Sequence, residues 1–499
     1  MTTDLSPFIP LDTASHSPLY RQIYDSIRRS ILNGEFASRT RLPATRQLAE
    51  QLGVSRMTVV NAYDQLFAEG YLEGKAGSGT FVASRLPEEY LHTPKAEKVT
   101  PKRPARSIDL SGYGRHLRDN LSVIQQNHAP TIVVPFQHGA IAIDEFPFDI
   151  WSKIAQRHLK YSIRDLSLYG DPAGYLPLRR AIAQHLRSSR GVVCDEGQVI
   201  ITAGTQQAVF LISRVLLSSG DSVWFEDPGH TSASDILYAA GAKIEYVPVD
   251  EEGFDLNGAI KSAGKAKLVY VTPSRQFPLG MTMSLQRRLN LLEWASENDA
   301  WIIEDDYDSE FRYSGRPLPA LQGLDRHSRV LYVGTFSKTV FPGLRLGCVV
   351  VPPDLVDLFA AARALTDLHS PVTDQMILAE FIADGHFERH VRRMRTLYRE
   401  RQSILISEVE KRLAGFLDIE KSDAGMHLIG WPKGVSDVTI SAKAAELGIR
   451  IAPVSRYAAN KLERGGLMLG YTAFDERQIK EGVKTLAKVV AGASHFTFD

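Results

Sequence analysis

One lysine in the C-terminal half of the chain has neighbours that could do chemistry. Lys338 follows the apolar run at residues 330–333, and it is accompanied by Thr335, Ser337 and, seven residues later, Arg345. An amine that forms a Schiff base has to lie at a fixed place, such as a strand end, and be partly shielded from water. A phosphate needs hydroxyls, amides and a cation nearby. The segment therefore predicts a Schiff-base lysine beside a phosphate site, although a lone loop lysine is more often only solvated.

A second segment could hold an anion. Gly204 and Thr205 lie in a predicted strand-to-helix turn at residues 202–208. Free amides at a helix N-terminus attract phosphate groups. Ordinary helix capping explains this turn equally well when it is taken alone.

A third segment is acidic and follows the predicted strand at residues 301–303. Strand alternation places Asp305 and Tyr307 on one face, and Glu304 and Asp306 on the other. An aspartate beneath a pyridine nitrogen keeps that nitrogen protonated, and a phenol can hold a ring hydroxyl. Metal binding is the alternative for such a cluster, but histidines at ligand spacing are missing from it.

These three segments need a sheet to bring them together. Short apolar runs at residues 199–202, 222–225, 267–271, 301–303 and 330–333 are separated by helical stretches. Continuous hydrophobicity is typical of strands that are covered on both faces. The pattern predicts a mostly parallel sheet in an α/β fold.

Together the segments resemble the fold type I aminotransferases over about residues 130–490. The resemblance implies a large, mostly parallel sheet domain, a small C-terminal α/β subdomain, and pyridoxal 5'-phosphate held as an internal aldimine on Lys338. It also implies cofactor contacts from Gly204, Thr205, Gln206, His230, Asp305, Tyr307, Thr335, Ser337 and Arg345. Asp305 would be the partner of the pyridinium, and His230 stands where such proteins usually carry a stacking tyrosine.

The chain departs from the aminotransferases at two places. Gln276-Phe277-Pro278 replaces the usual Asn-Pro pair, and the substrate-carboxylate arginine is missing within residues 466–471. Both changes resemble regulators of the MocR or GabR type, which use another arginine for an acid group. By position this implies Arg456, with Arg275 as a second candidate for binding the effector. A salt bridge is the alternative role for each arginine.

The N-terminal region predicts two helices, a tight turn, a third helix and a hairpin. The turn at residues 53–55 has the geometry of a helix-turn-helix, with Ser55 as N-cap of the third helix. When Val59, Ala62, Tyr63 and Leu66 face inward, the side chains of Thr58, Asn61 and Gln65 point outward. Hydrogen-bonding residues on that face suit a DNA groove.

The residue string at residues 42–63, together with residues 69–72 and 77–82, resembles the GntR family of winged helix-turn-helix repressors. The resemblance covers about residues 17–83 and implies double-stranded DNA as a partner. We predict DNA contacts from Arg46, Ser55, Arg56, Thr58, Asn61 and Gly79. Gly79 would lie at the wing tip, where a backbone without Cβ can approach the minor groove.

Proline and basic residues at about residues 85–107 predict a semi-stiff linker. We therefore expect a DNA-binding domain at residues 17–84, a linker at 85–130 and a cofactor-binding domain at 131–499. Lys+Arg and Asp+Glu both number 58, so the summed charge says nothing of a partner. The sequence contains no apolar run of about 18 residues and no basic N-terminal signal, which predicts a cytoplasmic protein without a membrane partner.

The sequence predicts a pyridoxal phosphate-dependent transcriptional regulator that senses an amino compound by forming an external aldimine. A head-to-tail homodimer is implied by the resemblance. Two alternatives stay open. One is a sensor of pyridoxal phosphate itself that controls vitamin B6 synthesis, and the other is a true aminotransferase with a DNA-binding head.

Overall fold

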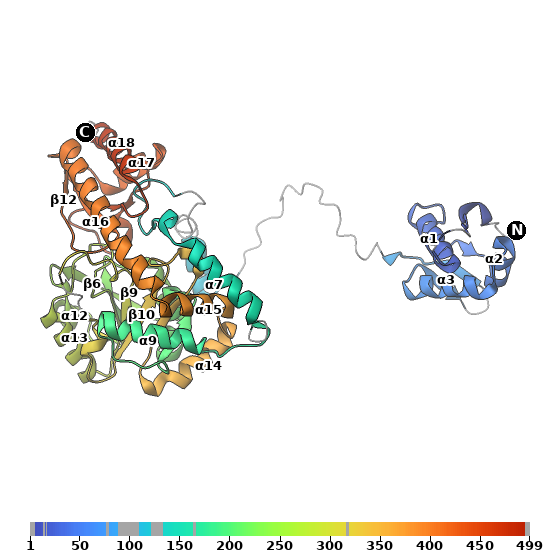
Figure 1. Ribbon diagram of the computed structural model, residues 1–499, viewed down its shortest axis with the longest axis horizontal. Coiled ribbons are helices and arrows are strands. Elements are labelled where there is room, and N and C mark those ends of the chain that lie inside the picture. The colour runs from blue at the N-terminus through green and yellow to red at the C-terminus, as the bar shows by residue number, and fades with distance from the viewer. Residues whose placement is uncertain are drawn as a thin grey trace. The chain divides into compact units, whose positions relative to one another are not determined.

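The computed structural model describes residues 5–12, 15, 17–75, 79–87, 109–120, 133–162, 166–315 and 319–494 (Figure 1). The chain divides into two compact units, Met1–Asp109 and Leu110–Asp499, which we name the head and the body. Most of the predicted linker and the wing residues Gly77 and Ser78 lie outside the described residues. No helix in the described part of the chain is long and apolar enough to cross a membrane.

The head contains α1 (Leu19–Leu32), α2 (Thr45–Leu52) and α3 (Arg56–Ala68). Gly53 ends α2 in the left-handed conformation, with φ 64°, which is the predicted role of this glycine. The Ser55 side chain then caps α3 by accepting a 3.1 Å hydrogen bond from the Thr58 amide. The predicted inward face is confirmed, because the buried residues of α3 are Val59, Ala62, Tyr63 and Leu66.

The wing is a three-stranded sheet rather than a hairpin alone. The predicted strands are β2 (Leu72–Lys75) and β3 (Gly79–Val82), and β1 (Arg41–Leu42) pairs with the other edge of β3. The sequence analysis missed β1 because two residues are too few to show an alternating pattern. The head is therefore a winged helix-turn-helix, as predicted.

The body is built around an eight-stranded sheet of order β4-β11-β10-β9-β8-β5-β6-β7. The strands are β4 (Val199–Thr202), β5 (Ser222–Asp227), β6 (Lys243–Asp250), β7 (Gly253–Phe254), β8 (Leu268–Val271), β9 (Trp301–Asp306), β10 (Val330–Thr335) and β11 (Gly347–Val350). Within this order β7 and β11 run in the direction opposite to that of the other six strands. The predicted α/β class with a mostly parallel sheet is confirmed, and all five apolar runs are strands.

Helices cover both faces of this sheet. One face packs against α10 (Thr205–Leu216), α11 (Thr231–Ala239) and α14 (Val356–Asp367). The other face packs against α7 (Phe148–Tyr161), α9 (Leu176–Arg190), α12 (Leu256–Ser262), α13 (Leu285–Glu297) and α15 (Val372–Ala383). Cover on both faces explains why β4 and β8 are buried along their whole length.

The C-terminal part of the body forms a small subdomain with an antiparallel sheet of order β12-β13-β15-β14. Its elements are α16 (His386–Leu413), β12 (Leu417–Ile419), β13 (His427–Pro432), α17 (Asp437–Glu446), β14 (Ala452–Pro453), β15 (Leu467–Gly470) and α18 (Glu476–Ser494). Figure 1 shows α17 and α18 at one end of the body and the long α16 running from that end toward α15. Phe136 joins the start of the body to this subdomain, because its carbonyl accepts a 3.0 Å hydrogen bond from the Gly470 amide.

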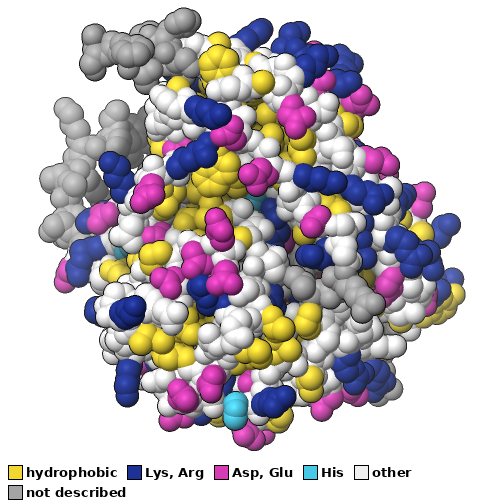
Figure 2. Space-filling model, turned by 90° about the vertical axis from the view of Figure 1, so that its left-hand side faces the viewer, with side chains coloured by type: hydrophobic (Ala, Val, Ile, Leu, Met, Phe, Trp, Pro, Cys, Tyr) yellow, Lys and Arg dark blue, Asp and Glu magenta, His cyan; other side chains and the backbone are white. Residues whose placement is uncertain are grey.

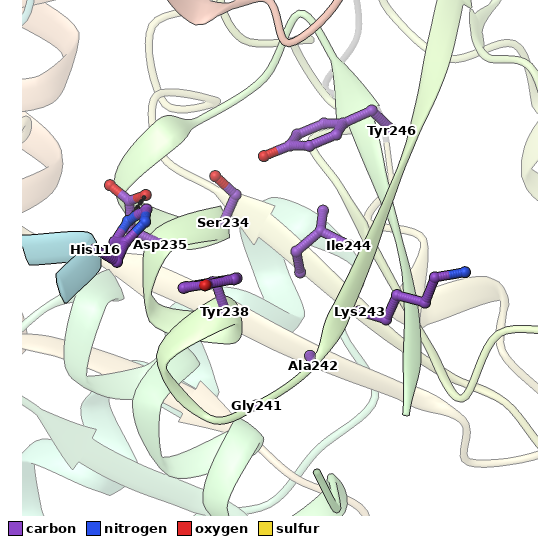
Figure 3. Close-up of a pocket in the computed structure, with 9 residues that line it drawn as sticks. All are labelled: His116, Ser234, Asp235, Tyr238, Gly241, Ala242, Lys243, Ile244 and Tyr246. Atoms are coloured by element: carbon purple, nitrogen blue, oxygen red, sulfur yellow. Dashed lines mark hydrogen bonds and ion pairs between the residues drawn. The ribbon is translucent and has the colours of Figure 1, made fainter. Parts of the chain in front are cut away.

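The predicted linker at residues 85–130 is not linker throughout. Its residues 112–119 form α5 (Gly112–Asp119), which packs on α11 of the body. The His116 Nε2 atom lies 3.1 Å from Asp235 Oδ1, and its ring lies 4.6 Å from the Tyr238 ring (Figure 3). These three residues line one side of a pocket of about 440 Å³ that β6 closes on the other side. The sequence analysis missed this helix because its docking depends on residues more than a hundred positions away.

We expect the His116→Ala variant to loosen α5. The substitution removes a partly buried polar contact and a ring contact, each worth about 1 kcal/mol or less. A loss of about 1 kcal/mol corresponds to roughly fivefold faster exchange of the α5 amides, measured by hydrogen–deuterium exchange. Arg118→Ala, which removes an exposed side chain of the same helix, is the control. Equal protection of α5 in the His116→Ala and native proteins would contradict the docking.

Candidate functional site

Lys338 lies just beyond the carboxyl end of β10, where the sequence placed it. Its Nζ donates a 3.1 Å hydrogen bond to the carbonyl of Gly139, a residue with φ +73°. A Cβ atom on Gly139 would lie only 2.7 Å from this Nζ, so a side chain at this position would displace the amine. Burial lowers the pKa of Lys338, and the nearby Asp308 carboxylate opposes this effect. The amine is therefore held in place and loses its proton more easily than a solvated lysine.

Asp305 on β9 has one occupied and one free carboxylate oxygen. Its Oδ2 accepts a hydrogen bond from the Tyr270 hydroxyl on β8. Its Oδ1 and the Tyr307 hydroxyl are buried, and neither has a hydrogen-bond partner within the described protein. Burial raises the pKa of Asp305 to about 7. Buried polar atoms are normally satisfied, so these two atoms fit a ligand that brings a ring N–H and a ring oxygen.

The other acidic residues of this segment have structural partners. Glu304 accepts hydrogen bonds from the amides of Leu321 (2.7 Å) and Gln322 (2.9 Å). Asp306 accepts hydrogen bonds from Arg190 Nε and the Tyr332 hydroxyl, both at 2.8 Å. The predicted division of the cluster between two faces is thus seen in the structure. Among the described residues, no group of three or more His, Cys, Asp or Glu side chains could hold a metal ion.

The pairing of β11 brings the predicted phosphate ligands together. Gly347, the first residue of β11, pairs with Thr202 at the end of β4 and with Thr335 at the end of β10. A Cβ atom on Gly347 would lie 2.9 Å from the Cα of Gly204, so the three chain segments approach closely at this point. The turn before α10 and the loop after β10 therefore share one edge of the sheet.

The groups around Gly204 form a cradle for an anion. Gly204 has φ +109° and precedes α10 without a side-chain cap, which leaves the first amides of the helix available. A Cβ atom on Gly204 would lie 3.3 Å from Arg345 Nη2, which donates a 2.7 Å hydrogen bond to the Ala203 carbonyl. The Ser337 and Thr335 hydroxyls are 3.2 Å apart at the same edge. Thr205 starts α10, and Gln206 is exposed beside it.

His230 lies at the start of α11 and faces Phe277. The two ring centres are 5.3 Å apart, and burial lowers the pKa of His230 to about 4, so the ring is neutral at pH 7. Phe277 also lies 5.8 Å from the Tyr307 ring. The preceding Gln276 donates a 2.7 Å hydrogen bond to the Pro228 carbonyl. Phe277 thus provides an apolar surface beside His230 and Tyr307, and Gln276 holds the loop at Pro228. Neither residue replaces the ring hydrogen bond of the usual asparagine.

Pyridoxal phosphate, the predicted cofactor, fits this donor set. An amine, an unsatisfied carboxylate, an unsatisfied phenol and an anion cradle lie on adjacent strand ends of one sheet. The sequence analysis missed His138 and Gly139, which complete the site from a distant segment. His138 Nε2 lies 3.3 Å from the Tyr457 hydroxyl, and burial followed by the charges of Lys338, His230 and Arg456 lowers the pKa of His138 to about 4. No local pattern marks a residue whose role depends on such contacts.

The two predicted effector arginines have different settings. The Arg456 side chain is exposed at the end of the turn Val454–Tyr457, close enough to His138 to affect its pKa. Arg275 is buried and engaged by the protein itself. Its Nε lies 3.3 Å from Asp308 Oδ2, and its Nη2 donates a 2.7 Å hydrogen bond to the His427 carbonyl. These contacts favour the salt-bridge alternative for Arg275, and its role as an effector ligand stays a prediction.

The predicted DNA-contact residues lie around the helix-turn-helix. Arg46 and Arg56 line a pocket of about 480 Å³ between α2 and α3, and Arg46 is paired with Glu50 at 3.5 Å. Asn61 is exposed on α3. Ser55 and Thr58 are less free than predicted, because their hydroxyls lie 2.8 Å apart and Ser55 caps the helix.

Two residues of this surface were missed by the sequence analysis. Met57 is 66% exposed between Arg56 and Thr58, and the Arg41 guanidinium packs against the wing residue Gly79. A Cβ atom on Gly79 would lie 3.1 Å from Arg41 Nε. Figure 2 shows a face of the body, on which acidic, basic and apolar side chains are interspersed. Such mixed charge is not typical of a nucleic-acid surface, so this face of the body is not a candidate for DNA contact.

Both parts of the chain match known families. The aminotransferase class I and II family matches residues 140–486, and the gntR family of bacterial regulatory proteins matches residues 19–82. The chain is 41% identical to a probable rhizopine catabolism regulatory protein, MocR, from Rhizobium meliloti, over 95% of this chain and 94% of that protein. It is 30% identical to the pyridoxine biosynthesis transcriptional regulator PdxR from Corynebacterium glutamicum, over 95% and 96% of the two chains. A solved structure of α-aminoadipate aminotransferase from Thermus thermophilus, complexed with N-(5'-phosphopyridoxyl)-L-leucine, is 28% identical, with a TM-score of 0.67, over 77% of this chain and 95% of that one.

We expect the Asp305→Asn variant to change how the stability of the cofactor-free protein depends on pH. Burial raises the pKa of Asp305 to about 7, whereas an unfolded chain has an aspartate pKa of about 4. The folded form therefore binds a proton that the unfolded form releases between these values, and the free energy of unfolding falls as pH rises through this range. The variant should lose part of this fall, measured as the melting temperature at about pH 5 and about pH 7. Asp299→Asn, at the exposed turn before β9, is the control, and an unchanged pH dependence in Asp305→Asn would refute the assignment.

Proposed function

The chain belongs to the family of regulators that join a gntR-type DNA-binding head to a class I and II aminotransferase body, and on this premise we propose that it controls transcription in response to an amino compound carrying an acid group. It is a pyridoxal phosphate-dependent transcriptional regulator. One observation supports an acid-bearing effector above all. Arg456 is exposed next to Tyr457, whose hydroxyl lies 3.3 Å from His138 Nε2, and the carbonyl of Gly139, the residue after His138, accepts the hydrogen bond of Lys338 Nζ.

The proposed roles follow from the positions of the residues. When bound, pyridoxal phosphate supplies an aldehyde that exchanges one amine for another. Lys338 would provide the amine of the protein, Asp305 Oδ1 would accept a hydrogen bond from the ring nitrogen, and the Tyr307 hydroxyl would bind the ring oxygen. His230 would stack on the ring. The phosphate would be held by Gly204, Thr205, Gln206, Thr335, Ser337 and Arg345.

Arg456 gives the effector a second point of attachment. An amino compound bound at the site would place its amine near Lys338, and its acid group would pair with the Arg456 guanidinium. Binding changes regulation only when the ligand prefers one arrangement of the protein over another. We further propose a homodimer, in which two heads read two half-sites of double-stranded DNA.

A second candidate effector is the cofactor itself, since the related protein from C. glutamicum is named for pyridoxine biosynthesis. In that case Arg456 has no ligand, and its replacement leaves the response unchanged. The exposure of Arg456 beside the site favours the acid-bearing compound.

We expect the Lys338→Ala variant to lose covalent attachment of the cofactor. The visible absorbance band that depends on the lysine should disappear, and the cofactor should separate from the protein on gel filtration, because hydrogen bonds alone then hold it. Lys433→Ala, which removes an exposed lysine of the small subdomain, should behave like the native protein. A Lys338→Ala protein that kept the band after gel filtration would show that another amine is used.

We expect Arg56→Ala to weaken binding to DNA from the upstream region of its own gene. Loss of one arginine contact to a base costs about 1–3 kcal/mol, or roughly 5- to 150-fold in affinity. Fluorescence anisotropy at moderate salt measures the effect. Arg21→Ala on α1 is a control, because this arginine is engaged with Asp25 at 3.6 Å. Equal losses in the two variants would indicate a general charge effect instead of contact by α3.

A further inference from the structure

The last residue of β5, Asp227, joins the large sheet to the segment that carries Arg456. Its Oδ1 accepts a 2.8 Å hydrogen bond from the Ala459 amide. Its Oδ2 accepts two more from Asn460, at 3.0 Å from the amide nitrogen and 2.8 Å from Nδ2. Asp227 is only 6% exposed. One buried carboxylate therefore holds a chain segment more than two hundred residues away.

Two other contacts fix the same segment. The Gly229 amide donates a 2.9 Å hydrogen bond to the Tyr457 carbonyl. Asp437, at the start of α17, accepts bonds from the amide and hydroxyl of Ser455, both at 3.0 Å. Arg456 thus lies between anchored neighbours, although its own side chain is exposed.

The residues that follow Asp227 lead to the proposed cofactor-binding residue His230. Residues 226–230 lead from β5 to His230 at the start of α11. Gln276 holds this stretch by donating a hydrogen bond to the Pro228 carbonyl. Glu226, at its start, accepts a 2.6 Å hydrogen bond from the Thr272 hydroxyl. Residues 226–230 therefore connect His230 with the segment that carries Arg456.

We propose that Asp227 is the positioning residue that sets the reach between Lys338 and Arg456, and so selects effectors by the distance between their amine and acid groups. The inference rests on the proposed function, in which Arg456 binds the acid group. Three hydrogen bonds to one charged group fix a segment more firmly than neutral contacts do. Without them, the small subdomain can place Arg456 at several distances, and the preference for one chain length is lost.

The test uses the holoprotein and simple probes. Glycine, β-alanine, γ-aminobutyrate and δ-aminovalerate are each titrated against the cofactor absorbance, beside the alkylamine that lacks the carboxyl group. The ratio of the two affinities is the acid preference at that chain length. In the native protein we expect this preference to peak at one length. Asp227→Ala should lower the peak about tenfold and flatten it, with the alkylamine affinities unchanged.

If Asp227→Ala folds poorly, a milder variant of the same contact and a matched control still test the proposal. Asn460→Ala removes one of the three donors and should give a smaller loss in the same direction. Asp325→Ala is the matched control, because Asp325 also accepts amide bonds, from Arg329 and Val330, at a turn of the same body. It should lower stability and leave the acid preference intact. Hydrogen exchange at residues 454–460 should rise in the Asp227 and Asn460 variants alone.

A double-mutant cycle with Arg456→Ala separates the two hypotheses. When Asp227 acts through Arg456, the Asp227 substitution has no further effect on acid preference once the arginine is gone. An unchanged acid preference in Arg456→Ala, or none in the native protein, would overturn the proposed role of Arg456. A loss in Arg456→Ala with native behaviour in both Asp227→Ala and Asn460→Ala would overturn only the role of Asp227.

Discussion

The site depends on one strand that runs against its neighbours. If the strand between β4 and β10 were parallel to them, its first residue would lie at the edge of the sheet where β4 and β10 begin, far from their carboxyl ends. Because β11 runs antiparallel between them, its first residue, Gly347, lies beside the carboxyl ends of both. The glycine lets Gly204 approach, and Arg345 comes to the same edge two residues earlier. The anion cradle thus results from the antiparallel direction of β11 and from the absence of a side chain at Gly347.

Burial then prepares the groups that face this cradle. Desolvation raises the pKa of Asp305, lowers that of His230 and lowers that of Lys338, so each group is shifted toward its neutral form. The shift has a structural cost, since Asp305 Oδ1 and the Tyr307 hydroxyl are buried without partners. A cofactor that satisfies both atoms recovers this cost on binding. The same feature that destabilises the empty protein therefore makes it bind the cofactor.

Regulation requires the site to communicate with distant elements, and α11 lies at the centre of the available contacts. His230 is the N-cap of this helix, and Asp235 and Tyr238 within the helix contact His116 of α5. Asp227, the last residue of the preceding strand β5, holds the segment that carries Arg456. The helix α5 and the segment that carries Arg456 thus contact α11 and the residues that lead into it.

The sequence by itself determined the features that depend on neighbouring residues. The apolar runs of the five predicted strands, the inward face of α3, the Gly53 turn and the place of Lys338 beyond β10 follow from local periodicity and residue type. Tertiary structure alone decided the features that depend on distant partners. It buried Arg275 against Asp308, left Arg456 exposed, docked α5 through His116, and brought His138 and Asp227 to the site. The physical reason is that a polar side chain takes its role from its burial and its partners, and in these cases the partners lie more than thirty residues away in the chain.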